Sequence, residues 1–309
     1  MKRVLITPRS FGQYDQTPYR KLEEAGIEVI MNPYRRIMTE EELTALIADV
    51  DGIIVGVDPL NANVLRHAKQ LKAIAKYGVG TDNIDLPYAK EHGIDVSITK
   101  NANSDAVADY AFALMMAVAR KILPIDKQCR QNDWKKITSI DIFKKKIGIL
   151  GFGNIGKGVA LRAKGFQMDV LAYDVYQDEA FAQEHGVRFT SVDEILRTCD
   201  FISVHLPLTS ETRNLIGKDA FEMMKETAVL VNTARGGIIN EDALYDALAA
   251  NRIYGAGIDV FQQEPPARTD FYELDNLIIG SHCSASTQGA VDNMSLFAVE
   301  NIIAALEGK

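Results

Sequence analysis

The chain has 309 residues, of which 47% are hydrophobic and 25% charged, so it is long enough for two domains and has the composition of an ordinary soluble globular protein. The formal net charge of −8 disfavours a nucleic-acid or anionic-membrane surface, where a basic face is expected, and we expect neither kind of partner. The three cysteines, Cys129, Cys199 and Cys283, are too few and too widely spaced for a disulfide framework or a zinc site, which favours a reducing cytoplasm and predicts no bound metal.

The N-terminal third of the chain alternates short apolar runs with amphipathic segments of helical spacing. Val and Ile dominate the runs, as in strands that are buried on both faces. This βαβ rhythm predicts a parallel sheet with helices on its faces. The expected strands are residues 3–7, 26–31, 52–57, 71–78 and 95–99.

A longer helix is predicted over residues 104–121. Ser104 can cap its start, and Arg120 and Lys121 fall at its end, where cations suit the helix dipole. The middle of the segment is apolar nearly all round, which predicts burial. A core helix inside one domain and a helix between domains or subunits both satisfy this pattern.

After Trp134 a second series of apolar runs begins, at 146–151, 169–174, 200–206, 228–234, 255–260 and 276–281. The last segment, 291–309, has helical spacing and no strand after it, so it can pack back on the first unit. We therefore predict an α/β fold of two doubly wound parallel-sheet domains. One comprises residues 1–100 plus 287–309, and the other 101–286.

The stretch GFGNIG carries Gly151, Gly153 and Gly156 between a predicted strand and a predicted helix. Such glycines allow a tight turn, close approach of the backbone to a pyrophosphate and close helix–strand packing, and the helix N-terminus attracts the phosphates. The next strand ends at Asp174, where a carboxylate can bind the adenosine ribose and repel a 2′-phosphate, so NAD is the expected cofactor. A P-loop is disfavoured because Gly158 stands where that motif needs Ser or Thr.

Polar side chains stand at the ends of the predicted strands of the second unit. They are His205, Arg235, Asp259 and His282, with Glu264 shortly after Asp259. Strand ends share one edge of a doubly wound sheet, and ligands bind there. Oxidation of a 2-hydroxy acid needs a cation for the carboxylate, a histidine to carry the proton and a carboxylate to orient the histidine. Arg235 suits the first role and Glu264 the last, and Asp259 can anchor a nicotinamide carboxamide.

The motifs GFGNIG…AYD, HLPLTSETRNLI, VNTARGGIINEDAL, GIDVFQQEPP and GSHCSAST occur in this order, and AKYGVGTDNIDL precedes them. Together they resemble the D-isomer-specific 2-hydroxyacid dehydrogenase family over almost the whole chain. The resemblance implies that Arg235, Glu264 and His282 are the catalytic set.

The resemblance also implies the rest of the site and the architecture. The substrate side is expected to be lined by Tyr77, Gly78, Val79 and Gly80, with main-chain N–H groups near the substrate carboxylate. Cofactor contacts are expected from Gly151, Gly153, Asn154, Ile155, Gly156, Asp174, His205, Pro207, Thr233 and Asp259. The family combines a flavodoxin-like substrate domain with a Rossmann NAD-binding domain, and is usually a homodimer built on the nucleotide domains.

The chain departs from its relatives near the histidine. Many have proline where this chain has Ser281, which is expected to loosen the turn without removing the imidazole. Cys283 is expected to pack rather than act as a nucleophile, because adjacent strand residues point to opposite faces. The remaining histidines, His67, His92 and His185, are expected at the surface.

The predicted activity is reversible hydride transfer between NAD and a small 2-hydroxy or 2-keto acid, similar to the phosphoglycerate dehydrogenases. Many of those carry an arginine where this chain has Gly56, so a phosphate would need another partner, for which Lys76 is a candidate. A glyoxylate or hydroxypyruvate reductase that acts on an unphosphorylated acid is the alternative. An NAD(H)-sensing corepressor is the alternative from another class, and the complete Arg/Glu/His set disfavours it.

Overall fold

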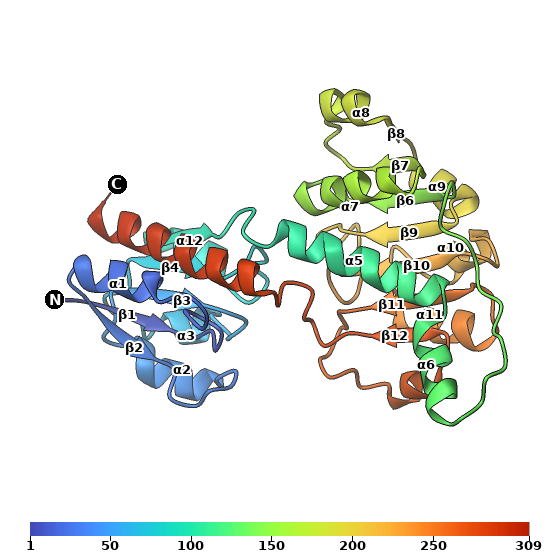
Figure 1. Ribbon diagram of the computed structural model, residues 1–309. Coiled ribbons are helices and arrows are strands. Elements are labelled where there is room, and N and C mark those ends of the chain that lie inside the picture. Colours follow the sequence, from blue (N-terminus) through green and yellow to red (C-terminus); the bar gives the residue numbers. More distant parts are fainter. Residues whose placement is uncertain (309) are drawn as a thin grey trace. The chain divides into compact units, whose positions relative to one another are not determined.

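A computed structural model describes residues 1–308; Lys309, the last residue of the expected C-terminal segment, lies outside the described residues. The chain divides into two compact units, each with its own parallel sheet (Figure 1). Each unit also has its own hydrophobic core. Unit 1 is Met1–Asn103 together with the chain from Ser286 onward, and unit 2 is Ser104–Ala285. The predicted α/β fold with two doubly wound sheets is confirmed, whereas the substrate role of unit 1 stays a prediction.

Unit 1 is built on five parallel strands in the order β2-β1-β3-β4-β5, a flavodoxin-like order. The strands are β1 (Lys2–Ile6), β2 (Ile27–Met31), β3 (Gly52–Val55), β4 (Ala73–Lys76) and β5 (Asp95–Ile98). The helices between them are α1 (Thr17–Glu24), α2 (Glu40–Ile47), α3 (Ala62–Leu65) and α4 (Leu86–Glu91). Strands β3 and β4 are shorter than the predicted 52–57 and 71–78, because the chain leaves the ladder at Gly56 and Tyr77 to form loops at the carboxyl edge.

The C-terminal helix α12 (Gln288–Glu307) lies along one face of the unit 1 sheet (Figure 1). It packs closely on β3, where a Cβ on Gly52 would come within 3.0 Å of Ile302 Cδ1. Among the described residues, α12 is the one helix whose length and apolar composition match a membrane span. Ala298, Val299 and Ile302 are completely buried in the core of unit 1, which accounts for that apolar composition.

Unit 2 holds seven parallel strands in the order β12-β11-β10-β9-β6-β7-β8. They are β6 (Lys146–Leu150), β7 (Asp169–Tyr173), β8 (Val187–Phe189), β9 (Phe201–Val204), β10 (Val229–Asn232), β11 (Gly255–Ile258) and β12 (Leu277–Ile279). The helices are α5 (Ser104–Ala119), α6 (Ile122–Arg130), α7 (Asn154–Gly165), α8 (Glu179–His185), α9 (Val192–Thr198), α10 (Lys218–Met223) and α11 (Glu241–Ala249), with a 3₁₀ turn at Thr269–Glu273. The strand order reverses beside β6, which is where a Rossmann sheet opens to its ligand.

Helix α5 is a core helix of unit 2, one of the two alternatives that its sequence allowed. It packs against β10, β11 and α7. Two glycines of β11 make room for it, because a Cβ on Gly257 would lie 2.9 Å from Leu114 Cβ and one on Gly255 would lie 2.8 Å from Val118 Cγ1. The absence of a side chain at these two positions therefore brings the helix close to the sheet.

Candidate active site

The glycine-rich turn joins β6 to α7 at the carboxyl edge of the unit 2 sheet. Gly151 has φ +97°, and a Cβ there would come within 2.5 Å of the main chain of His205. A Cβ on Gly156 would lie 2.2 Å from the Gly151 carbonyl oxygen, whereas Gly153 has nothing within 4 Å. Gly153 also caps α7 without any side-chain hydrogen bond. The turn is thus tightly packed behind and open at its tip, and it leads into the N-terminus of α7, where the helix dipole favours an anion.

Asp174 follows β7 and lies next to this turn. Its Oδ2 accepts a hydrogen bond from the main-chain N–H of Phe152 at 2.6 Å, and its Oδ1 accepts one from Tyr176 N at 3.0 Å. The carboxylate is half-buried. The glycine turn therefore holds the Asp174 carboxylate in place. This carboxylate is the group that was predicted to select NAD.

Two buried polar atoms without partners mark the next strand ends. Among residues 1–308, Thr233 Oγ1 after β10 and His205 Nδ1 after β9 make no hydrogen bond. The other ring nitrogen of His205 lies 2.8 Å from Ser203 Oγ. Burial lowers the pKa of His205 to about 3, so the ring is neutral at physiological pH. Buried polar groups are normally satisfied, so these two atoms fit a polar ligand along this edge.

His282 and Glu264 form a hydrogen-bonded pair in unit 2. His282 Nδ1 lies 2.9 Å from Glu264 Oε2 and 3.1 Å from Oε1, and each side chain is about 40% exposed. Burial raises the pKa of Glu264, but the hydrogen bond and charge of His282 outweigh it, so this pKa lies below its usual value. With Nδ1 engaged by the carboxylate, Nε2 is left to exchange a proton with a ligand.

Arg235 belongs to the same neighbourhood. It follows β10, and its positive charge contributes to the lowered pKa of Glu264. Its neighbour Gly236 packs directly on the segment that leads to Glu264, since a Cβ on Gly236 would lie 2.0 Å from the main-chain carbon of Phe261. The Asn232 side chain donates to the Arg235 carbonyl oxygen at 2.9 Å and fixes the turn. The structure thus brings the three predicted catalytic side chains together in one unit.

The buried carboxylate of Asp259 holds the His282 turn. Asp259 is 0% exposed, and its Oδ1 and Oδ2 accept hydrogen bonds from Cys283 N at 3.0 Å and Ser284 N at 2.9 Å. The Asp259 carbonyl accepts a third from His282 N at 2.8 Å. The sequence analysis did not predict that Asp259 holds this turn. Contact with a nicotinamide amide stays a prediction, since both oxygens already hold main-chain N–H groups.

The thiol of Cys283 faces away from the histidine pair. Its Sγ lies 3.3 Å from Tyr110 Oη of α5 and 3.7 Å from Asp259 Oδ1. Burial raises the pKa of Tyr110 well above its usual value, so the phenol stays protonated. This geometry suits a packing role for the thiol. The sequence analysis did not single out Tyr110, although it is the one tyrosine of a mostly apolar helix and could have been found by that signal.

The predicted substrate-side loop of unit 1 follows β4. Gly78 has φ +123°, and its N–H donates to Thr99 Oγ1 at 2.8 Å. Within residues 1–308, the main-chain N–H groups of Val79 and Gly80 make no hydrogen bond. The loop therefore offers two donors at the carboxyl edge of its sheet, as a carboxylate site requires. The Tyr77 side chain, in contrast, points toward α12, where its phenol donates to the Val291 carbonyl oxygen.

Lys76 supports the same loop from beneath. Its side chain is 5% exposed, and its ammonium group donates to the Gly56 carbonyl oxygen and, at 2.9 Å, to Asn83 Oδ1. The Asn83 amide donates in turn to the Asp58 carbonyl oxygen at 2.6 Å. Lys76 is thus engaged inside unit 1 rather than presented to a ligand. Sequence reasoning missed Asn83, although it lies within the quoted AKYGVGTDNIDL.

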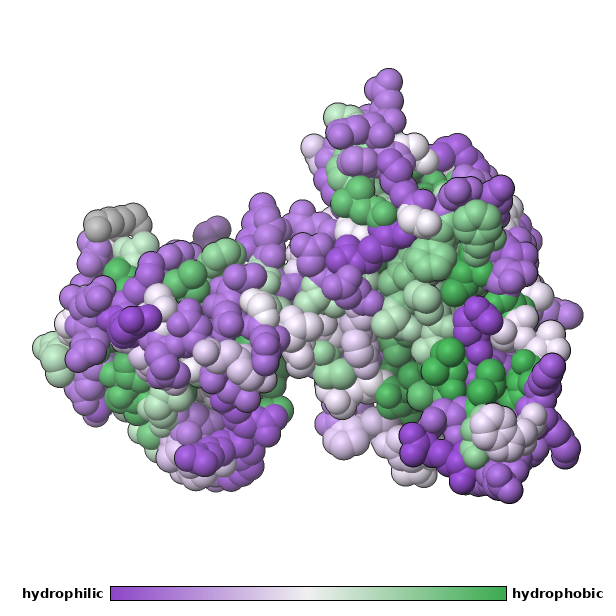
Figure 2. Space-filling view, viewed as in Figure 1, coloured by the Kyte–Doolittle hydropathy of each residue, from purple (hydrophilic) through white to green (hydrophobic). Residues whose placement is uncertain are grey.

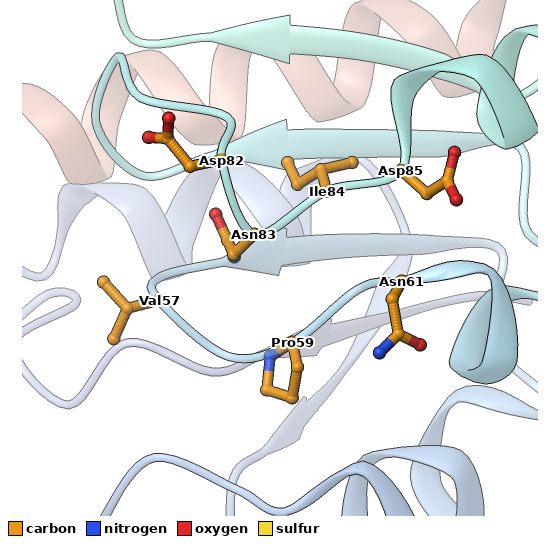
Figure 3. A pocket seen from close by; sticks show the side chains of 7 residues that line it. All are labelled: Val57, Pro59, Asn61, Asp82, Asn83, Ile84 and Asp85. Carbon is orange, nitrogen blue, oxygen red and sulfur yellow. The ribbon is translucent and has the colours of Figure 1, made fainter. Parts of the chain in front are cut away.

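A shallow hollow of about 400 Å³ lies beside these residues in unit 1. Figure 3 shows the two segments that face each other across it, one from the loop after β3 and one from the loop after β4. Asp85 and Asn61 on its rim cap α4 and α3 through hydrogen bonds to Tyr88 N and Val64 N. Their polar atoms thus serve the helices, and we assign no ligand to this hollow.

The remaining histidines are His67 and His92 in unit 1 and His185 in unit 2. His67 and His92 are exposed, and His92 stacks on Tyr88 with ring centroids 3.9 Å apart. His185 is half-buried against Phe181, so it is less exposed than predicted. No group of three or more His, Cys, Asp or Glu side chains in the described chain could hold a metal ion.

Comparison with known proteins decides the family. The model of the D-isomer specific 2-hydroxyacid dehydrogenase NAD-binding domain matches residues 112–284, more than half of the chain. A glyoxylate reductase of Korarchaeum cryptofilum is 36% identical over 305 residues, which cover 94% of this chain and 92% of that protein. The chain belongs to the D-isomer specific 2-hydroxyacid dehydrogenase family.

Two further relatives of this dehydrogenase family are informative. A D-3-phosphoglycerate dehydrogenase of Archaeoglobus fulgidus is 39% identical over 275 residues, but this chain spans only 52% of its length. The crystal structure of D-lactate dehydrogenase from Aquifex aeolicus, complexed with NAD and lactic acid, superposes with a TM-score of 0.85 and 29% identity, covering 99% of this chain and 96% of that one.

Membership in the dehydrogenase family confirms the predicted family, enzyme class and cofactor. The protein is an NAD-dependent oxidoreductase that acts on the CH–OH group of donors. Its NAD-binding part lies within unit 2, and the open glycine tip, Asp174 and the unpartnered Thr233 hydroxyl are features that fit a dinucleotide.

Proposed function

We propose that this dehydrogenase interconverts a small, unphosphorylated 2-keto acid and its D-2-hydroxy acid, with glyoxylate and hydroxypyruvate as the best candidates. The main support for this chemistry is the hydrogen-bonded His282–Glu264 pair on the unit that binds NAD. The positive charge of Arg235 acts on the Glu264 carboxylate of this pair.

The three side chains divide the work on the substrate. Arg235 binds the substrate carboxylate through two parallel N–H bonds, which fixes the carbonyl carbon in place. His282, protonated, donates from Nε2 to the carbonyl oxygen during reduction and takes the proton back during oxidation. Glu264 holds the ring through Nδ1 and stabilises its positive charge. Bound NADH supplies the hydride for reduction.

The cofactor contacts that we propose follow the carboxyl edge of unit 2. The glycine turn and the first N–H groups of α7, with Asn154 and Ile155, hold the pyrophosphate. Asp174 binds the adenosine ribose and favours NAD over NADP, because its carboxylate would repel a 2′-phosphate. His205, Pro207 and Thr233 line the path toward the nicotinamide.

The environment of Lys76, which supports the unit 1 loop, favours an unphosphorylated substrate. Lys76 was the candidate for binding a phosphate, yet its ammonium group is buried and engaged by Gly56 and Asn83. Moving it to a ligand would break these bonds inside a buried network, at a cost of about 1–3 kcal/mol per unsatisfied group.

A substrate panel tests this proposal. The purified protein is mixed with NADH and, in turn, glyoxylate, hydroxypyruvate, pyruvate and 3-phosphohydroxypyruvate, and nicotinamide absorbance is followed. We expect kcat/KM for glyoxylate or hydroxypyruvate to exceed that for the phosphorylated acid. A preference for 3-phosphohydroxypyruvate would contradict the proposed substrate, and binding of NADH without turnover of any acid would favour the corepressor alternative.

The catalytic assignment is tested by two variants. We expect His282→Gln to bind NADH normally and to lose most of its turnover, because the proton carrier is gone. Arg235→Lys should impair reduction severely, since one ammonium cannot replace a bidentate fork. Near-normal kcat/KM in either variant would remove that residue from the mechanism.

We also propose that unit 2 pairs with a second copy through α6 and its surroundings. Helix α6 buries none of its residues, and Ile122 and Leu123 are 52% and 53% exposed. Figure 2 shows apolar side chains gathered on unit 2 over the C-terminal end of α5 and over α6. Trp134 and Phe143, on the segment after α6, are also exposed. An apolar surface of this kind indicates an interface, and the family resemblance indicates a homodimer.

A further inference from the structure

The substrate-side loop of unit 1 is tied to α12 by the side chain of its first residue. The Tyr77 phenol donates to the Val291 carbonyl oxygen at 3.1 Å and lies 3.3 Å from Ser295 Oγ. Ser10 Oγ donates to the same phenol at 3.4 Å. Tyr77 was expected to line the substrate side, but only its main chain belongs to the loop, whereas its ring enters the core of unit 1.

Ser295 makes this contact part of a larger cluster. It is completely buried, accepts a hydrogen bond from Gly12 N at 3.1 Å and donates to the Val291 carbonyl oxygen at 2.7 Å. Burial raises the pKa of Tyr77, so its phenol stays protonated and can donate. Three segments that are distant in sequence thus meet at adjoining hydroxyl groups: the turn after β1, the loop after β4 and α12.

The other side of the loop is fixed by main-chain bonds. Gly78 N donates to Thr99 Oγ1, and Thr99 N returns a bond to the Gly78 carbonyl oxygen at 3.0 Å. Between these anchors and the next turn lie the N–H groups of Val79 and Gly80, which bond to nothing in the described chain. The direction of these two donors therefore depends on how firmly Tyr77 and Gly78 are held.

We propose that Tyr77 is a positioning residue: by tying the loop to α12, its phenol aims the N–H groups of Val79 and Gly80 at the substrate carboxylate. This inference rests on the proposed function. The hydroxyl is the specific element, because the ring alone makes a tilted contact with Phe11 at a centroid distance of 6.4 Å, which does not fix a direction.

Tyr77→Phe tests the proposal, because it removes the hydroxyl and keeps the ring. We expect KM for glyoxylate to rise about three- to tenfold, the range that one net hydrogen bond allows, with kcat and the KM for NADH changed less than about twofold. Tyr88→Phe is the matched control: Tyr88 lies in the same unit, its phenol makes no hydrogen bond in the described chain, and its constants should match the wild type.

A double variant separates positioning from general packing. If Tyr77 and Ser295 act as one tether, Tyr77→Phe with Ser295→Ala should raise KM no more than the larger single change does. Full additivity would overturn the proposal, as would an unchanged KM in Tyr77→Phe. An equal loss of keto-acid and NADH binding together with a lower Tm would also overturn it, since that pattern marks a merely structural role.

Failure of the proposed function has a different signature. It would show as a wild-type protein that reduces no 2-keto acid, and the loop is then tested by binding of oxamate to the NADH complex. Oxamate binding that is severalfold weaker in Tyr77→Phe than in Tyr88→Phe supports the proposal. Equal binding in the two variants, or no oxamate binding by the wild type, overturns it.

Discussion

His282 occupies a backbone conformation that few side chains adopt. Its φ is +54°, in the left-handed region, where a residue other than glycine costs about 1–2 kcal/mol. The three hydrogen bonds from residues 282–284 to Asp259 hold the turn in that conformation. Strain of this kind persists where the surroundings over-determine it, and here it places the imidazole against Glu264. Ser281 directly precedes the histidine in this turn.

Glu264→Gln is expected to move the pH profile of reduction to lower pH. Burial raises the pKa of Glu264, but His282 lowers it more, so the carboxylate is ionised at neutral pH and favours a protonated imidazole. Without that charge, the fall of kcat/KM on the alkaline side should begin at a lower pH. The measurement is kcat/KM for glyoxylate from pH 5.5 to 9.

The control for this variant is Glu241→Gln. Glu241 supports the same loop through Gln262 N at 2.7 Å, so its loss disturbs the loop without removing the partner of the histidine. Its profile should keep the wild-type midpoint. Superimposable profiles for Glu264→Gln and the wild type would count against the proposed role of the pair.

His205 is expected to make the protein sensitive to mild acid. Burial lowers its pKa to about 3 in the folded chain. Between pH 6.5 and 3 the imidazole is therefore protonated in the unfolded chain and neutral in the folded chain. The stability that this neutral ring contributes is complete above pH 6.5 and declines as the pH falls from 6.5 toward 3. The slope is up to about 1.4 kcal/mol per pH unit.

His205→Gln should therefore lose less stability than the wild type between pH 7 and 5. Thermal unfolding at several pH values checks this, with His67→Gln at an exposed position as the control. Parallel curves for His205→Gln and the wild type would show that the ring takes up its proton in the folded state.

At the scale of elements, the strands that run through both cores could be predicted, because runs of Val and Ile leave little choice. Strand β8 was missed, since Val187–Phe189 is a three-residue edge strand without a run of its own. The glycine turn was predictable because a Cβ at Gly151 or Gly156 would collide with the main chain, while Gly153 leaves the tip of the turn open. The direction of the Tyr77 ring was not, because it depends on α12, which lies more than 200 residues later in the chain.

The catalytic residues of the site could be predicted from the sequence. The residues that hold them in place could not. Arg235, Glu264 and His282 follow strands of one sheet, and parallel strands bring their carboxyl ends to one edge. That Asp259 holds a turn, or that Lys76 is buried, depends on which main-chain groups face each side chain. Such long-range contacts leave no periodic pattern in the sequence.

Asp259→Asn tests the link between β11 and the turn after β12. An amide accepts with one oxygen only, so its NH2 group would face the N–H of Cys283 or Ser284 and leave it unsatisfied, at about 1–3 kcal/mol. We expect a lower Tm and a kcat reduced at least about tenfold, with the Kd for NADH nearly unchanged. Weaker NADH binding with preserved kcat would instead favour the nicotinamide contact.

At the scale of the whole molecule, the proposed homodimer can be tested by introducing charged side chains on α6. Ile122→Glu combined with Leu123→Glu places two carboxylates where apolar side chains would be desolvated against the partner. We expect the wild type to be a dimer and the variant a monomer by light scattering coupled to size exclusion. Met31→Glu, at a comparably exposed apolar position of unit 1, is the control and should stay dimeric. A wild-type monomer would contradict the proposal.

Unit 1 contains β1 to β5 and also α12, and the whole of unit 2 lies between these two parts in the sequence. Until α12 emerges, one face of a nearly complete sheet lacks the cover that Ala298, Val299 and Ile302 later supply, while all of unit 2 is translated in between. While the residues of unit 2 are being translated, that apolar face therefore stays uncovered, and an exposed apolar face on an incomplete sheet is prone to aggregation.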